Sequence, residues 1–229
     1  MGMRFIIIGT EGGVSEGAHI DALKDSLVRQ VPTSRAVGLE VVPLGLGGNH
    51  GHVHLVENAN VAVDALMADE NHVLSCIGDE DDAEKWLVCD YDSLNTHGVD
   101  EEALRNEANA AGFTLIINKP NFEFYVLGLL KGFDHAKTIK PSQYEHEINQ
   151  AIDELNRVNV EEKGFGQASR IPPYSKKRHI APKLFSQLAT LHPELLDNVL
   201  VETAAIDYRE TSYSEMPVLV RHLVDAYTG

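Results

Sequence analysis

The feature that most constrains the fold of this chain is a regular alternation of short apolar runs with stretches of helical periodicity. The run from Arg4 to Thr10 predicts a buried strand, and the spacing of apolar residues over Glu16 to Gln30 predicts a helix. The same patterns predict further strands at Gly38 to Leu44, Trp86 to Cys89 and Phe113 to Ile117, with helices at 55–66 and 99–111. Because βαβ units build parallel sheets, we expect an α/β fold whose mainly parallel sheet is covered by helices on both faces.

The C-terminal part of the chain changes character after Pro120, where the pattern becomes helical. Helices are expected near 122–131, 141–158, 180–204 and 215–227, with a loop at 160–174 and no strand that rejoins the sheet. A chain of 229 residues with 43% hydrophobic content is long enough for one α/β domain and a helical appendage. We therefore expect an α/β domain over residues 1–135 and a helical region over residues 140–229 that packs on it or beside it.

The net charge and the number of cysteines limit the classes of function that this chain can have. The net charge of −16 argues against a large non-specific nucleic-acid surface, because such surfaces gain affinity by neutralising phosphates. It does not exclude a nuclease in which metal ions neutralise the phosphates at the site itself. Cys76 and Cys89 are too few for a disulfide framework, and the run Phe5 to Ile8 is too short for a signal peptide or a membrane span. These observations predict a cytoplasmic protein that does not enter the membrane.

Acidic residues follow two of the expected strands directly. Glu11 closes the first strand, while Asp90 and Asp92 close the strand that begins at Trp86. The carboxyl ends of parallel strands meet at one edge of a sheet, so we expect these carboxylates to converge there. A spacing of two residues along extended backbone puts Asp90 and Asp92 on the same side. Since Mg²⁺ binds oxygen ligands and often needs one or two carboxylates, the three acids predict a Mg²⁺ site.

Each of these acids also has a structural interpretation. An Asp at the end of a strand is often the N-cap of the next helix, and an Asp-x-Asp pair is common. Glu16 can be a first-turn acid of the helix that follows Glu11, and Glu123 can be a helix-start carboxylate that the helix dipole favours. The shared position of Glu11 and Asp90, each after a continuous apolar strand, is what favours the functional interpretation.

Three segments together resemble the RloB-like proteins, a Toprim-related group associated with bacterial and archaeal phage defence. They are Glu11-Gly12 with Ser15-Glu16, then Asp90-Tyr91-Asp92, then Asn118 through Glu123. The chain departs from the family pattern at Ser15, which replaces Thr, and at Asn118-Lys119, which replaces Ser-Asn. The segment from Ser214 to Leu223 also resembles the closing helix of the family, so the likeness covers nearly the whole chain.

The resemblance implies a Toprim fold and a metal-dependent nuclease that cleaves the phosphodiester bonds of DNA, tRNA or another RNA. It implies that Glu11 acts as general acid or base, that Asp90 and Asp92 hold Mg²⁺ or Mn²⁺, and that Glu11 contributes to the same metal site. Glu123 is assigned to the catalytic group, where it would support the metal ligands or contact the substrate. The resemblance also implies a partner ATPase of the AAA or ABC type, in anti-phage defence, and a homo-oligomer is a further hypothesis.

Substrate contacts are expected at two places near the acids. Gly12 and Gly13 lack side chains and allow a phosphate to approach the backbone closely. Lys119, in the third motif, supplies a positive charge next to the predicted edge of the sheet.

A dense basic cluster follows a Pro-Pro-Tyr sequence in the C-terminal region, at Lys176, Lys177 and Arg178. In an otherwise acidic chain this cluster is the natural phosphate contact, and Tyr174 and Tyr208 are candidates for stacking on bases. The structural alternative is a solvated helix start.

Other interpretations remain open from the sequence. His50, His52 and His54 alternate along one loop and form a candidate zinc or copper site, although such runs are more often solvated loops. A strand that ends in Asp-x-Asp also resembles the haloacid-dehalogenase phosphatases, in which Asp90 would be the nucleophile. A third hypothesis is a non-catalytic interaction or sensor subunit of a defence complex.

Overall fold

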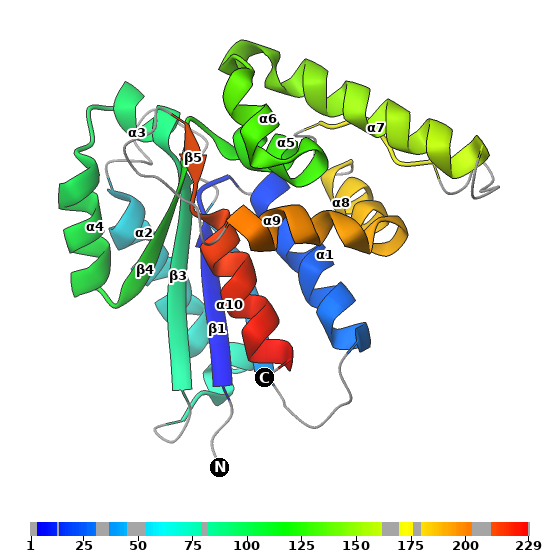
Figure 1. Ribbon diagram of the computed structural model, residues 1–229. Helices are drawn as coiled ribbons and strands as arrows, with labels where there is room; N and C mark the ends of the chain where they lie inside the picture. The colour runs from blue at the N-terminus through cyan, green and yellow to red at the C-terminus, as the bar shows by residue number, and fades with distance from the viewer. Residues whose placement is uncertain are drawn as a thin grey trace.

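A five-stranded sheet lies at the centre of the computed structural model, in the order β2-β1-β3-β4-β5 (Figure 1). The strands are β1 (Arg4–Thr10), β2 (Val37–Pro43), β3 (Asp82–Asp90), β4 (Phe113–Lys119) and β5 (Tyr213–Ser214). Strands β1 to β4 are parallel to one another, and β5 pairs antiparallel with β4. The structure describes residues 4–12, 14–30, 37–44, 54–78, 82–161, 170–175, 180–202 and 212–228.

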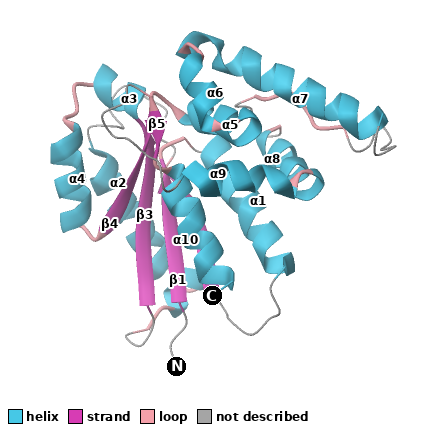
Figure 2. Cartoon of the chain, in the orientation of Figure 1, coloured by secondary structure: helices cyan, strands magenta, loops and turns pink. Residues whose placement is uncertain are grey.

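Helices cover both faces of this sheet (Figure 2). They are α1 (Ser15–Gln30), α2 (Leu55–Ala68), α3 (Tyr91–Thr96), α4 (Glu101–Ala110), α5 (Phe122–Lys131), α6 (Phe133–Thr138), α7 (Tyr144–Glu161), α8 (Ala181–Leu191), α9 (Leu196–Glu202) and α10 (Met216–Thr228). Single 3₁₀ turns add η2 (Val73–Cys76), η3 (Pro141–Gln143) and η5 (Pro193–Leu195). Helices α2 and α4 cover one face, and α1, α5, α8 and α10 pack in the core on the other. The expected α/β fold with a mainly parallel sheet is confirmed, and it is consistent with a Toprim-like fold.

The two faces of the sheet build separate cores because side chains alternate along each strand. Ile6, Ile8 and Val88 point into the larger core, whereas Ile7 and Leu87 point into the smaller one. The larger core also takes in residues of α7, α8 and α10, so segments from both 1–135 and 140–229 share it. Whether these two segments unfold separately stays a prediction.

In the described residues, no helix combines the length and the apolar composition needed to cross a membrane.

Two sequence expectations about the C-terminal region are wrong. The expectation that no strand rejoins the sheet is overturned by β5, whose two residues are too few to show alternation. The helix expected over 180–204 is interrupted at His192, between α8 and η5. Pro193 explains this break, because proline disfavours a helical residue before it and cannot donate a backbone hydrogen bond.

Glu215 fastens the C-terminal helix to the sheet. Its backbone N–H donates to the carbonyl of Ile117 at 3.0 Å, and its Oε2 accepts from the N–H of Ile117 at 2.7 Å. Arg105 of α4 donates to the Oε1 atom of Glu215 at 3.1 Å. Only 5% of Glu215 is exposed, so these bonds are protected from competition with water.

Replacing Glu215 with Ala should destabilise the protein by about 2 kcal/mol or more, because the buried N–H of Ile117 then has no acceptor. Urea denaturation measures this change. Glu161→Ala is the matched control, since it removes an exposed pair with Arg157 and should cost no more than about 0.5 kcal/mol. Equal effects from the two variants would contradict the assigned role of Glu215.

Candidate active site

The ends of β1 and β3 bring two acids together at one edge of the sheet. The N–H of Glu11 donates to the carbonyl of Val88 at 3.0 Å, which continues the pairing of β1 and β3 beyond the end of β1. The Oε2 atom of Glu11 accepts from the N–H of Asp90, the last residue of β3, at 3.0 Å. Glu11 therefore has a carboxylate that the backbone itself holds beside Asp90.

Asp92 also lies near these acids, but it belongs to a helix and not to extended backbone. Strand β3 ends at Asp90, and Asp92 is in the first turn of α3, so the two side chains are not alternate positions of one strand. This corrects the expectation of an extended Asp-x-Asp pair. The N–H of Asp92 donates to the carbonyl of Pro120 at 2.9 Å, and Oδ2 accepts from the amide Nδ2 of Asn121 at 3.3 Å. These bonds tie α3 to the loop after β4.

Two further acids come from the first turns of α1 and α5. Glu16 and Glu123 are 7% and 6% exposed, which is low for carboxylates, and the positive ends of the two helix dipoles stabilise them. A Cβ atom at Gly12 would lie 2.6 Å from Oε2 of Glu16. The space that Gly12 leaves is therefore filled by the carboxylate of Glu16, and a phosphate contact at Gly12 stays a prediction. Gly13 lies outside the described residues.

The charges of these acids all act on Asp90. Burial raises the pKa of Asp90 well above its ordinary value, and the charges of Glu16, Glu11, Asp92 and Glu123 raise it further. The Oδ1 atom of Asp90 is buried and has no hydrogen-bond partner among the described residues. A cation at this oxygen would reduce the repulsion among the carboxylates and would give the oxygen a partner.

Polar side chains surround Asp90 on the same face of the sheet. Asn118 stands opposite Asp90 in the pairing of β3 with β4, and Thr10 is the last residue of β1. Within the described part of the chain, the Oγ1 atom of Thr10, the Nδ2 atom of Asn118 and the Oδ1 atom of Asn121 are buried without partners. Ordered water or a ligand commonly satisfies such atoms. Sequence reasoning missed Thr10, although a polar residue at the end of an apolar strand was a signal for it.

The side chains around Asp90 supply only some of the ligands that a hard cation needs. Across the residues that the structure describes, no three or more His, Cys, Asp or Glu side chains are grouped to hold a metal. A cage made wholly of protein ligands is therefore absent from that part of the chain. Mg²⁺ is nevertheless bound in many proteins by one or two carboxylates and several waters, which is what the free Oδ1 atom of Asp90 can provide.

Tyr174 lies inside the site and not on its surface. It is 3% exposed, its hydroxyl donates to Oε1 of Glu123 at 3.0 Å, and its N–H donates to Oδ1 of Asn149 at 2.7 Å. The expectation that its ring stacks on bases is wrong for this arrangement, because the ring is buried in the larger core. Burial, followed by the charge of Glu123, raises the pKa of the Tyr174 hydroxyl, so the hydroxyl stays a proton donor.

Lys119 holds a positive charge at the end of β4. Its Nζ atom lies 4.3 Å from the centre of the Tyr91 ring and 5.6 Å from that of Tyr213. These aromatic faces attract the ammonium group and limit where it can move. The arrangement leaves a lysine beside Asn118, in the strand next to Asp90.

Several residues singled out from the sequence lie outside the described ranges. They are the basic residues Lys176, Lys177 and Arg178, together with Tyr208, His50 and His52. His54 is described, and its ring lies 3.1 Å from the carboxylate of Glu57 on the exposed surface of α2. The proposed histidine site and the basic phosphate contact therefore stay predictions.

Comparison with known protein families, with curated proteins and with solved structures finds no match. Function is accordingly inferred from the geometry and electrostatics of the site.

We expect Asp90→Asn to raise the melting temperature of the metal-free protein at pH 7. The pKa of an unfolded Asp is about 3.9, so the raised pKa of folded Asp90 makes its ionised form destabilising above about pH 4. This penalty grows as the pH rises toward the folded pKa, and Asn does not carry it. The gain should therefore disappear below about pH 4, where the carboxyl group is protonated in both states.

Thermal unfolding followed by circular dichroism between pH 3.5 and 8 measures this effect. Asp64→Asn, at an exposed position of α2, is the control and should change the melting temperature little at any pH. A lower melting temperature for Asp90→Asn at pH 7 would mean that the carboxylate of Asp90 supports the fold.

Proposed function

We propose that this chain is a Mg²⁺-dependent nuclease of the Toprim and RloB type, which cleaves phosphodiester bonds. The observation that carries the proposal is the buried carboxylate of Asp90, which has one oxygen without a partner among the described residues and is surrounded by four other acids. A fold gains no stability from gathering like charges in this way, so the cluster is better explained by a cation that binds there. Its position at the carboxyl edge of a parallel sheet is where α/β proteins place their ligands.

In the proposed reaction, Asp90 and Asp92 hold the metal and Glu11 moves a proton. Mg²⁺, when bound, stabilises charge that develops on the phosphoryl oxygens. Glu11 suits proton transfer because Asp90 N–H fixes one of its carboxylate oxygens. Tyr174 orients Glu123 through its hydroxyl, and Lys119 is a candidate to contact a phosphate. Mn²⁺ is the natural substitute metal.

The acidic net charge bears on the substrate and its delivery. With a charge of −16 the chain has little capacity for non-specific binding of DNA or RNA, so recognition relies on local contacts. We assign these contacts to Lys119 and to the basic residues 176–178. A partner ATPase or a second copy of the chain, acting with the enzyme in phage defence in the cytoplasm, belongs to the same proposal.

A non-catalytic interaction subunit is the second candidate. The net charge of −16 leaves little surface for nucleic acid, which suits a protein that senses or docks without turnover. The two candidates differ in whether metal binding leads to cleavage.

We expect the wild-type protein to cleave at least one of three pools, DNA, RNA or tRNA, with Mg²⁺ or Mn²⁺ present. Millimolar Mg²⁺ should also raise its melting temperature, because a ligand that binds only the folded state stabilises it. Asp90→Asn and Asp92→Asn should lose both effects. Glu11→Gln should keep part of the thermal shift but lose roughly 10²- to 10⁴-fold in cleavage rate, as expected for loss of a general acid or base.

Asp64→Asn serves as control and should behave as wild type in both assays. A metal-dependent thermal shift without cleavage of any pool would favour the interaction subunit. No response to either metal would refute the metal site. Trapping of a covalent adduct on Asp90 by fluoroberyllate would instead support a phosphatase of the haloacid-dehalogenase type.

A further inference from the structure

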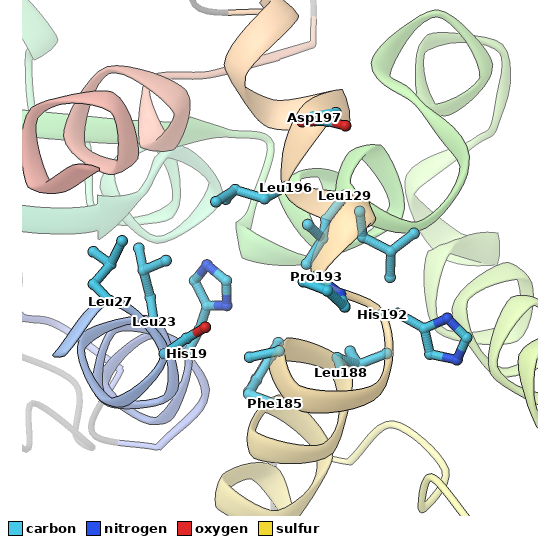
Figure 3. Close-up of a pocket in the computed structure, with 13 residues that line it drawn as sticks. His19, Leu23, Leu27, Leu129, Phe185, Leu188, His192, Pro193, Leu196 and Asp197 are labelled. Carbon is cyan, nitrogen blue, oxygen red and sulfur yellow. The ribbon is translucent and has the colours of Figure 1, made fainter. Parts of the chain in front are cut away.

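A pocket of about 170 Å³ lies further along α1, between this helix, α8 and the segment from η5 to α9 (Figure 3). We call it the α1–α8 pocket. Most of its wall is apolar, with Leu23, Leu27, Leu129, Phe185, Leu188 and Leu196 as the main lining residues. Four separate helices contribute these side chains, so the pocket is built from the larger core and not from one surface groove.

His19 is one of the polar side chains that line this pocket, together with Ser26, His192 and Asp197. Figure 3 shows its ring directed from α1 into the space between the helices, whereas the ring of His192 is turned away. The Nε2 atom of His19 lies 2.7 Å from the hydroxyl of Tyr125, which is fully buried. A buried hydroxyl needs an acceptor for its proton, and in the described structure the partner of the Tyr125 hydroxyl is His19. This favours Nε2 as the acceptor, which puts the ring hydrogen of His19 on Nδ1.

The chemistry of His19 restricts the charge of a ligand. Burial lowers the pKa of His19 to about 4, so the ring is neutral at physiological pH. Its Nδ1–H is then a neutral donor on a ring that lines the pocket. Asp197 at the pocket and the net charge of −16 both disfavour an anion, while the apolar wall disfavours any full charge.

The volume restricts the size of a ligand. An apolar protein cavity of about 150 Å³ is large enough to bind benzene, and the α1–α8 pocket is of similar size. We infer that this pocket binds a small neutral molecule with a single ring and one hydrogen-bond acceptor, such as a carbonyl oxygen, which accepts from the Nδ1–H of His19. The inference does not depend on the proposed nuclease function.

The pocket and the acidic cluster share two helices. Helix α1 carries both Glu16 and His19, and α5 carries both Glu123 and Leu129. The hydrogen bond between His19 and Tyr125 joins these two helices. A bound molecule would therefore contact the helices that hold two of the five acids.

Binding is tested with acetophenone, ethylbenzene and benzoate on the full chain without metal or nucleic acid. Acetophenone and ethylbenzene have nearly the same shape, but only acetophenone has an acceptor oxygen. We expect acetophenone to bind roughly fivefold to tenfold more tightly than ethylbenzene, which is the effect of one neutral hydrogen bond. Benzoate should not bind. Ligand-observed NMR and titration calorimetry give the affinities.

Two variants assign the binding to this pocket. Ala189→Leu adds volume at a partly exposed lining position and should abolish binding of both neutral probes while the protein stays folded. The double variant His19→Phe with Tyr125→Phe removes the donor and its partner together, and should make the two probes bind equally. Val28→Ala, at an exposed position of α1, is the matched control.

The inference is overturned if neither neutral probe binds wild type, if the two bind equally to wild type, or if Ala189→Leu leaves binding unchanged. Circular dichroism checks that each variant is folded. Because the assay contains no metal, its failure leaves the nuclease proposal untouched, and failure of the nuclease assays leaves this pocket untouched.

Discussion

The arrangement of the site depends on the repulsion among carboxylates at the edge of the sheet. Four other acids lie around Asp90, and a nearby group positions or stabilises each of them. A backbone N–H holds Glu11, helix N-termini stabilise Glu16 and Glu123, and an Asn side chain contacts Asp92. These contacts fix the positions of the carboxylates, and the helix N-termini also bring partial positive charge close to Glu16 and Glu123. They do not remove the repulsion at Asp90, whose pKa stays well above its ordinary value, and this is the carboxylate at which the proposed cation would bind.

Local patterns in the sequence were sufficient to predict the four parallel strands and the position of Glu11 and Asp90 at their ends. Apolar runs mark buried strands, and a polar residue directly after such a run marks the carboxyl edge. Glu11 and Asp90 follow this rule, and the fold places them in contact. From the sequence, Glu16 can equally be a first-turn acid of the helix that follows Glu11. Its burial beside Gly12, which distinguishes it from a solvated acid, depends on tertiary packing.

The features that the sequence could not give depend on contacts between distant segments. The turn of the chain into α3 after Asp90 depends on a bond from Asp92 to the loop after β4. The sequence places Tyr174 next to a basic cluster, and this neighbourhood predicts stacking on bases. The structure buries it against Glu123, 51 residues away in the chain. Strand β5 is likewise defined only by its pairing with Lys119 and Asn118.

These distant contacts change how the C-terminal region should be understood. Tyr174 reaches Glu123, and Ser214 donates to Oδ1 of Asn118 at 2.6 Å, so residues after position 140 bond to two polar side chains around Asp90. The bond from Ser214 occupies the oxygen of the Asn118 amide, and the amide nitrogen has no partner in the part of the chain that the structure describes. The C-terminal region thus determines the orientation of polar groups in the site as well as covering the sheet. A chain shortened to the α/β segment would keep the acids but lose the bonds that orient their neighbours.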